Sequence, residues 1–141
     1  MDERLAKIEL FIVKHHVLSL ATYAEGDISA CSLFYAYDSS SQTFVVASDP
    51  KTTHIQHIQK HPEVAGTIVL ETRQVGKIEG LQFRGTMRSV EGEDGRRLYY
   101  KAFPYALAMQ PTLWEIKVTF FKLTDNRLGF GKKLIWQAAL A

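Results

Sequence analysis

The sequence predicts a mainly β fold, an antiparallel barrel or sandwich with peripheral helices. Six or so short β-prone runs are separated by tight polar turns, and strands joined in this way pair antiparallel. Eight Phe, six Tyr and two Trp favour sheet and offer rings for stacking on a flat ligand. The chain has 141 residues, so we expect a single domain over residues 1–141.

The first half of the chain predicts one helix followed by three strands. Residues 2–14 have an amphipathic pattern, with Leu5, Ile8 and Ile12 on one helical face. The following β-prone runs are separated by Glu25-Gly26-Asp27 and by Asp38-Ser39-Ser40-Ser41. They cover residues 17–23, 28–37 and 43–48.

The second half predicts a short helix, a further helix and the remaining strands. Thr53 is the expected N-cap of a helix that runs through Lys60 and stops before Pro62. Gly80 and Gly85 are expected at bulges or at close backbone approaches. We expect strands at 64–70, 77–90 and 114–120, a helix at 93–101, and a final strand or extended tail at 129–136.

Composition argues against several classes of protein. The net charge of +2 is too small to indicate a nucleic-acid partner. One cysteine, Cys31, excludes an internal disulfide, and its apolar neighbours favour a small buried residue. No run of about 18 apolar residues predicts a membrane-spanning helix, and the start of the chain lacks the apolar core of a secretion signal. We therefore expect no membrane partner and a cytoplasmic location.

The turn at residues 48–54, with the sequence Ser-Asp-Pro-Lys-Thr-Thr-His, offers two interpretations. A helix start has free amide groups and a favourable dipole, so it can bind a phosphate. Lys51 would add a positive charge, and Thr52 and Thr53 would add hydroxyl donors. The other interpretation is an ordinary helix cap beside a surface lysine.

Three histidines on the same predicted helix suggest a metal site, but we favour a polar helix face. His54, His57 and His61 are three and four residues apart, which a helix places on one side. Glu63 is the nearest further ligand and lies beyond a proline, so we predict no metal. These histidines, or His15 and His16, could instead bind haem.

The order of elements and several motifs resemble the FMN-binding split barrels related to pyridoxamine 5'-phosphate oxidase. Within them the chain resembles the small bacterial YhbP-like group. The matching motifs are Lys51-Thr52-Thr53-His54, Gly80-Leu81-Gln82-Phe83-Arg84-Gly85, Trp114-Glu115-Ile116, Thr124-Asp125-Asn126, Leu128-Gly129-Phe130-Gly131-Lys132-Lys133 and Ile135-Trp136.

The resemblance implies a Greek-key split barrel and a homodimer with two FMN molecules between its subunits. The phosphate would meet Ser48, Lys51, Thr52 and His54, and the flavin ring would run along Cys31, Ser32, Leu33, Val46 and Ala47. Gln82 would lie near the ring, and the segment that includes Lys132, Lys133 and Trp136 would lie near the active cleft. Candidate residues for the dimer interface are Phe34, Tyr35, Trp114 and Trp136.

Two departures from the oxidases bear on activity. Residues 29–34 lack the arginine that helps to hold the phosphate, so Lys51 and His54 would carry more of that task. The C-terminus does not reproduce the basic residues that grip the vitamin substrate, which argues against pyridoxamine phosphate oxidation. Three functions remain: an FMN-dependent oxidoreductase, a flavin-binding protein without turnover, and a haem-binding protein on the same fold.

Overall fold

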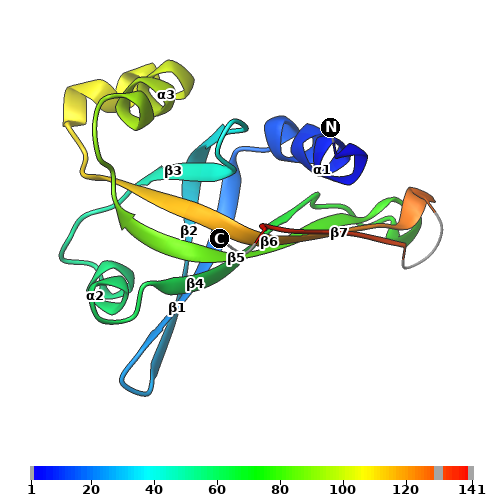
Figure 1. The fold of residues 1–141 in the computed structure, drawn as a ribbon, viewed down its shortest axis with the longest axis horizontal. Helices are drawn as coiled ribbons and strands as arrows, with labels where there is room; N and C mark the ends of the chain where they lie inside the picture. The colour runs from blue at the N-terminus through cyan, green and yellow to red at the C-terminus, as the bar shows by residue number, and fades with distance from the viewer. Residues whose placement is uncertain (1, 129–131, 140–141) are drawn as a thin grey trace.

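The structure is a computed structural model that describes residues 2–128 and 132–139. Within these residues the strands form one antiparallel sheet with the order β3-β2-β1-β4-β5-β6-β7 (Figure 1). The strands are β1 (Val17–Ala24), β2 (Asp27–Asp38), β3 (Thr43–Ala47), β4 (Glu63–Val69), β5 (Glu79–Ser89), β6 (Leu113–Asp125) and β7 (Lys133–Gln137). This confirms the predicted fold class.

The sheet closes because β3 also pairs with β6. β3 occupies the first half of one β6 edge, opposite Leu113–Lys117, and β7 occupies the second half of that edge, opposite Phe120–Thr124. The barrel is therefore split between the start of β3, at Thr43, and the end of β7, at Gln137. The predicted final strand is present as β7, while Gly129, Phe130 and Gly131 lie outside the described residues.

In the described part of the chain, three α-helices lie at the periphery of the sheet (Figure 1). Asp2 caps the first helix through hydrogen bonds from the amides of Arg4 and Leu5. None of the described helices is long and apolar enough to cross a membrane. The helices are α1 (Glu3–Lys14), α2 (Thr53–Lys60) and α3 (Asp94–Ala102), with short 3-10 turns η1 (Val75–Lys77), η2 (Pro104–Met109) and η3 (Asn126–Leu128).

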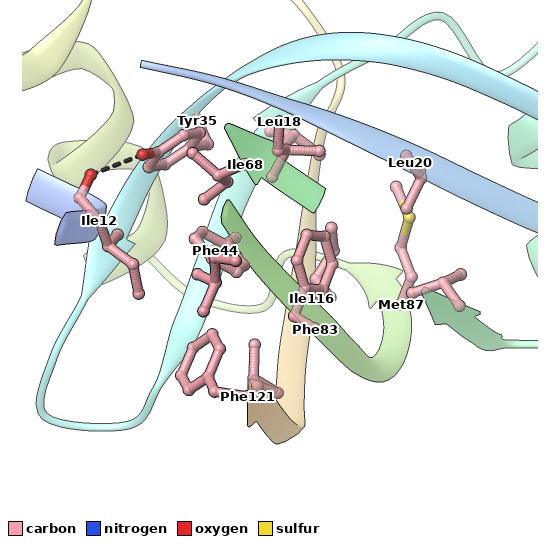
Figure 2. Close-up of a cluster of buried hydrophobic side chains, with 14 of the residues drawn as sticks. Ile12, Leu18, Leu20, Tyr35, Phe44, Ile68, Phe83, Met87, Ile116 and Phe121 are labelled. Carbon is pink, nitrogen blue, oxygen red and sulfur yellow. Dashed lines mark hydrogen bonds between the residues drawn. The ribbon is translucent and has the colours of Figure 1, made fainter. Parts of the chain in front are cut away.

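An aromatic and aliphatic core fills the barrel (Figure 2). Phe44 lies at its centre, with its ring centroid 5.0 Å from that of Phe83 and 6.2 Å from that of Phe121. Helix α1 covers this core with Ile8, Phe11 and Ile12, and the Tyr35 hydroxyl donates to the Ile12 carbonyl at 2.5 Å. The predicted apolar face of the first helix is thus confirmed.

The long strand β6 contains a bulge that the alternating sequence pattern did not reveal. Arg84 pairs with Phe120 and Gly85 pairs with Val118, so Thr119 is an extra residue. Beyond it the buried positions change from even to odd numbers. Phe120, expected on the inner face, lies under the Arg84 guanidinium at 4.1 Å, and Phe121 is the buried residue.

Among the glycines that the structure describes, two allow backbones to approach closely, and only one of them was expected. A Cβ at Gly85 would lie 2.3 Å from the Lys117 carbonyl oxygen, as predicted for a bulge position. A Cβ at Gly66 would lie 2.2 Å from the Ser19 carbonyl oxygen, which the sequence did not indicate. Gly80, the other predicted position, has no heavy atom within 4 Å of an added Cβ.

Candidate functional site

The turn between β3 and α2 is held in place by hydrogen bonds of the Ser48 amide and carbonyl with the residues at the start of β6. The Ser48 amide donates to the Thr112 carbonyl at 3.0 Å, and the Trp114 indole N–H donates to the Ser48 carbonyl at 2.9 Å. Asp49 then closes the turn, because its carboxylate accepts from the Lys51 amide at 2.8 Å. The chain is thereby fixed just before α2 begins.

A buried imidazole gathers two hydroxyls at this turn. His54 Nε2 lies 2.6 Å from Ser48 Oγ and 3.2 Å from Thr52 Oγ1. Burial lowers the pKa of the His54 imidazole, and the neighbouring His57 lowers it further. His54 is therefore neutral at pH 7, so it adds hydrogen-bonding capacity here and not a positive charge.

The start of α2 leaves its amide groups available to a ligand. The N-cap is Thr52, one residue earlier than the expected Thr53, and no described side chain caps the helix. Thr52 Oγ1 instead donates to the Asp49 carbonyl at 2.8 Å. The first-turn amides have no acceptor within an α-helix and point outward.

Lys51 supplies the positive charge at this turn. Its side chain is exposed, and no carboxylate of residues 2–128 and 132–139 forms an ion pair with it. Together with the uncapped amides and the hydroxyls of Ser48 and Thr52, it forms a donor set that suits a phosphate monoester.

Beside this turn, the middle of β2 is paired with another strand along one edge only. Residues 31–33 pair with β1, whereas β3 pairs only with the later residues Tyr35–Asp38. Alternate main-chain groups of an antiparallel strand face its two sides, so those directed away from β1 are open in the described residues. Ser32 is exposed, while Cys31 and Leu33 pack partly against the core. Burial also raises the pKa of the Cys31 thiol.

The predicted β3 contacts are less accessible than those on β2. The Val46 side chain is fully buried in the main core, and Ala47 packs against a second cluster under α3. Their side chains therefore face neighbouring core residues, which leaves main-chain atoms as the groups that could meet a ligand. The structure brings the turn and these two strand segments together.

Gln82, Lys132 and Trp136 lie in another part of the same chain. Gln82 is exposed on the outer face of β5 and lines a cavity of about 290 Å³ over the paired strands β4 and β5. Trp136 packs on Phe121 at 5.6 Å between ring centroids, and Lys132 is exposed. On β6, the residues opposite Trp136 and Ala47 are roughly 25 Å apart along the strand. A single copy of the chain does not bring the two groups together.

His57 of α2 and His61, which follows the helix as its C-cap, have separate partners. His57 Nδ1 lies 2.8 Å from Thr22 Oγ1, and its Nε2 lies 2.8 Å from Asp27 Oδ2, which ties α2 to the β1–β2 hairpin. His61 meets the Tyr23 ring edge-on at 5.7 Å. No three His, Cys, Asp or Glu side chains of the described ranges are grouped around a common point suited to a metal. Sequence reasoning noted the spacing of these residues but missed the His57 contacts.

A buried acidic pair near the C-terminal segment also escaped sequence reasoning. Arg127 forms ion pairs with Glu79 and Asp125, two largely buried carboxylates. Burial and a hydrogen bond with Asp125 raise the pKa of Glu79. Burial would raise the pKa of Asp125 as well, but hydrogen bonds from Arg127 outweigh this effect and lower the pKa of Asp125. The matching motif at Thr124-Asp125-Asn126 was the available signal. This cluster fixes η3 against the start of β5 and the end of β6.

Two bacterial relatives match this chain over nearly its whole length. It is 42% identical over 140 residues to a UPF0306 protein of Enterobacter sp. strain 638, covering 97% of this chain and 99% of the relative. It is 37% identical over 137 residues to the UPF0306 protein YhbP of Escherichia fergusonii, covering 95% and 93%. No family model matches the chain.

Solved structures share the fold at low sequence identity. A haem-binding protein from Mycobacterium smegmatis has a TM-score of 0.80 and 16% identity, and the match covers 97% of this chain and 59% of that protein. An FAD-binding protein from Mesorhizobium loti has a TM-score of 0.69 and 14% identity, covering 84% and 90%. The barrel is thus one on which both haem and flavin proteins are built.

Proposed function

The chain belongs to the UPF0306 family. On the basis of this family and of the donor groups at the turn before α2, we propose that the protein is an FMN-binding flavoprotein. The FMN phosphate binds at Ser48, Lys51, Thr52 and the first amides of α2. The flavin ring lies along residues 31–33 of β2 and the end of β3. With one cysteine and hence no internal disulfide, the chain suits the reducing cytoplasm, where we place it.

The donor set at the start of α2 is the observation that carries this proposal. A phosphate monoester bears close to two negative charges at neutral pH and accepts hydrogen bonds on each free oxygen. The turn offers it an unpaired lysine, helix amides without a cap, and hydroxyls held in place by His54. Residues 29–34 of β2 contribute no basic side chain, so Lys51 is the main charge toward the phosphate.

We further propose that the protein works as a homodimer. The turn and the group formed by Gln82, Lys132 and Trp136 lie far apart in one protomer, and a second copy would allow both to face one flavin. The outer face of β1, β2 and β4 is well suited to such a contact, because it exposes apolar side chains next to one another. They include Val17, Tyr23, Ile28, Phe34 and Val69.

The proposed activity is an oxidoreductase reaction on a small organic substrate. Bound FMN would supply hydride chemistry at its N5 atom, which the side chains of this protein do not provide. The chain's own residues would bind the phosphate, orient the ring and exclude water from it. Burial keeps the Cys31 thiol protonated beside the proposed ring site, so it is not a nucleophile at neutral pH.

Titration with two flavins tests the proposal. A charge-assisted contact to phosphate contributes about 1.5–3 kcal/mol, so Lys51→Ala should weaken FMN binding roughly ten- to a hundredfold. Riboflavin, which lacks the phosphate, should bind wild type and Lys51→Ala equally well. Lys60→Ala is a matched control, because Lys60 is exposed at the other end of α2 and pairs with Glu25 at 3.3 Å.

Two outcomes would contradict the proposal. Equal FMN affinity of wild type and Lys51→Ala would remove Lys51 from the site. A wild-type protein that ignores both flavins but takes up haem, with a Soret band in its visible spectrum, would favour the haem function instead.

A further inference from the structure

The hydrogen atoms around His54 can be assigned from the contacts at the turn. A hydroxyl has one proton to donate, and that of Thr52 goes to the Asp49 carbonyl at 2.8 Å. Thr52 Oγ1 can therefore only accept from His54 Nε2, which lies 3.2 Å away. Such a contact requires a hydrogen on Nε2.

The other ring nitrogen supports the same assignment. In a neutral imidazole one nitrogen carries the proton, and the hydrogen bonds decide which one. Nε2 has two oxygen neighbours, at 2.6 and 3.2 Å, while no described residue forms a hydrogen bond with Nδ1. The His54 residue is largely buried, with 8% of its surface exposed, so its proton is favoured at Nε2, where two oxygen acceptors lie within reach.

We infer that His54 holds its proton at Nε2 and thereby makes Ser48 a hydrogen-bond donor to the ligand phosphate. With Nε2 donating to Ser48 Oγ, the serine proton is not used within the turn and can point to the site. With Nε2 unprotonated, the Ser48 proton would be donated to the ring and the phosphate would meet a lone pair. His54 is thus a positioning residue that acts through Ser48, and this inference rests on the proposed phosphate site.

The fixed backbone of Ser48 makes this arrangement specific. Its amide and carbonyl are both engaged, with Thr112 and with the indole of Trp114, so only the side-chain proton can change partner. Thr52 Oγ1 lies 3.5 Å from Ser48 Oγ, at the limit of a hydrogen bond, and is a poor competitor for that proton. The His54 ring therefore decides the direction of the Ser48 hydroxyl.

The proton position is measurable without any flavin. Long-range proton–nitrogen NMR spectra of the ligand-free protein should show a protonated Nε2 and an unprotonated Nδ1 for His54, assigned by comparison with His54→Gln. A spectrum of the opposite tautomer would overturn the inference whether or not the protein binds FMN.

Titrations with FMN and riboflavin test the coupling to Ser48. Ser48→Ala should weaken FMN binding about tenfold, the effect of one hydrogen bond to a charged group. His54→Leu should weaken it several-fold, and the double variant should lose no more than Ser48→Ala alone, because both changes remove one interaction. His54→Gln retains an N–H group and should bind FMN nearly as well as wild type.

The controls separate this inference from the proposed function. None of these variants should alter riboflavin binding, and Ser39→Ala, in the exposed β2–β3 turn, should alter neither titration. Additive losses for Ser48→Ala and His54→Leu, or equal losses for His54→Gln and His54→Leu, would overturn the role of His54 while leaving FMN binding intact. A wild type that binds no FMN would instead refute the proposed function.

Discussion

Phe120 and Phe121 are adjacent residues with different environments. The bulge at Thr119 directs Phe120 to the outer face under Arg84 and buries Phe121 beside Phe44. Phe121→Ala should therefore lower the free energy of unfolding by about 3–5 kcal/mol, through lost burial and a cavity. Phe120→Ala should lower it by less than about 1 kcal/mol. Urea denaturation of both variants checks this, and equal losses would contradict the bulge.

Gly66 and Gly80 form a second matched pair at the residue scale. Gly66→Ala would push a methyl group against the Ser19 carbonyl and the Phe83 ring, and both lie too close for it. We expect a loss of about 1–3 kcal/mol in the free energy of unfolding. Gly80→Ala has open space and should change it by less than about 0.5 kcal/mol. Thermal unfolding of the two proteins compares them, and a tolerated Gly66→Ala would show that β1 and β4 can separate.

At the scale of the elements, helix α2 is attached to the sheet at its first turn and near its middle. His54 meets the end of β3 through Ser48, and His57 meets the β1–β2 hairpin through Thr22 and Asp27. The inner face of the helix buries Ile55 and Ile58 between these polar contacts. The position of the proposed phosphate site is therefore set by β1, β2 and β3 together.

Local sequence signals identified most elements, and their failures have physical causes. Polar turns and the alternation of apolar with polar residues identified the strands. Residues 49–54 identified the turn, because the residues that form it are neighbours in sequence. β6 was predicted to end at residue 120, since the bulge reverses the alternation there; it continues to Asp125. The turn η2 was missed because Phe103-Pro104 was interpreted as a helix end.

The candidate site was predictable only in part for a related reason. Lys51, Thr52 and His54 are neighbours in sequence, so one turn assembles them. The distance from this turn to Gln82 and Trp136 depends on pairing between remote strands, which no local pattern encodes. Likewise, Tyr35 and Trp114 were candidates for a dimer interface but are buried within a single copy of the chain, whereas Phe34 is 57% exposed.

At the scale of the whole molecule, the exposed outer face predicts self-association. We expect sedimentation at micromolar concentration to show a dimer. Ile28→Glu should shift it toward monomer, because Ile28 is 76% exposed and a charge would be buried in the interface. Val75→Glu, at an exposed apolar residue of η1 outside the β1–β2–β4 face, is the control. A wild-type monomer would refute the dimer.

The stability of the molecule should fall as the pH decreases below about 6.5, the usual histidine pKa. Burial is the main cause of the lowered pKa values of both His15 and His54 in the folded protein. The unfolded chain therefore binds protons first, so stability is fully present above that pH and is lost as the pH falls toward the folded values. Urea midpoints at pH 7.5 and 5.5 measure the loss, which should be smaller in His54→Gln; an equal loss would contradict the lowered pKa of His54.

The pairing of β3 with β6 joins segments about 70 residues apart in the chain. Closing so long a loop costs entropy before any contact compensates for it, and folds dominated by remote pairs form slowly. Because Thr112 and Trp114 hold Ser48 only once this pair has formed, we expect the turn proposed to receive the phosphate to be completed late in folding. Added FMN should therefore slow unfolding while leaving the rate-limiting step of refolding unchanged.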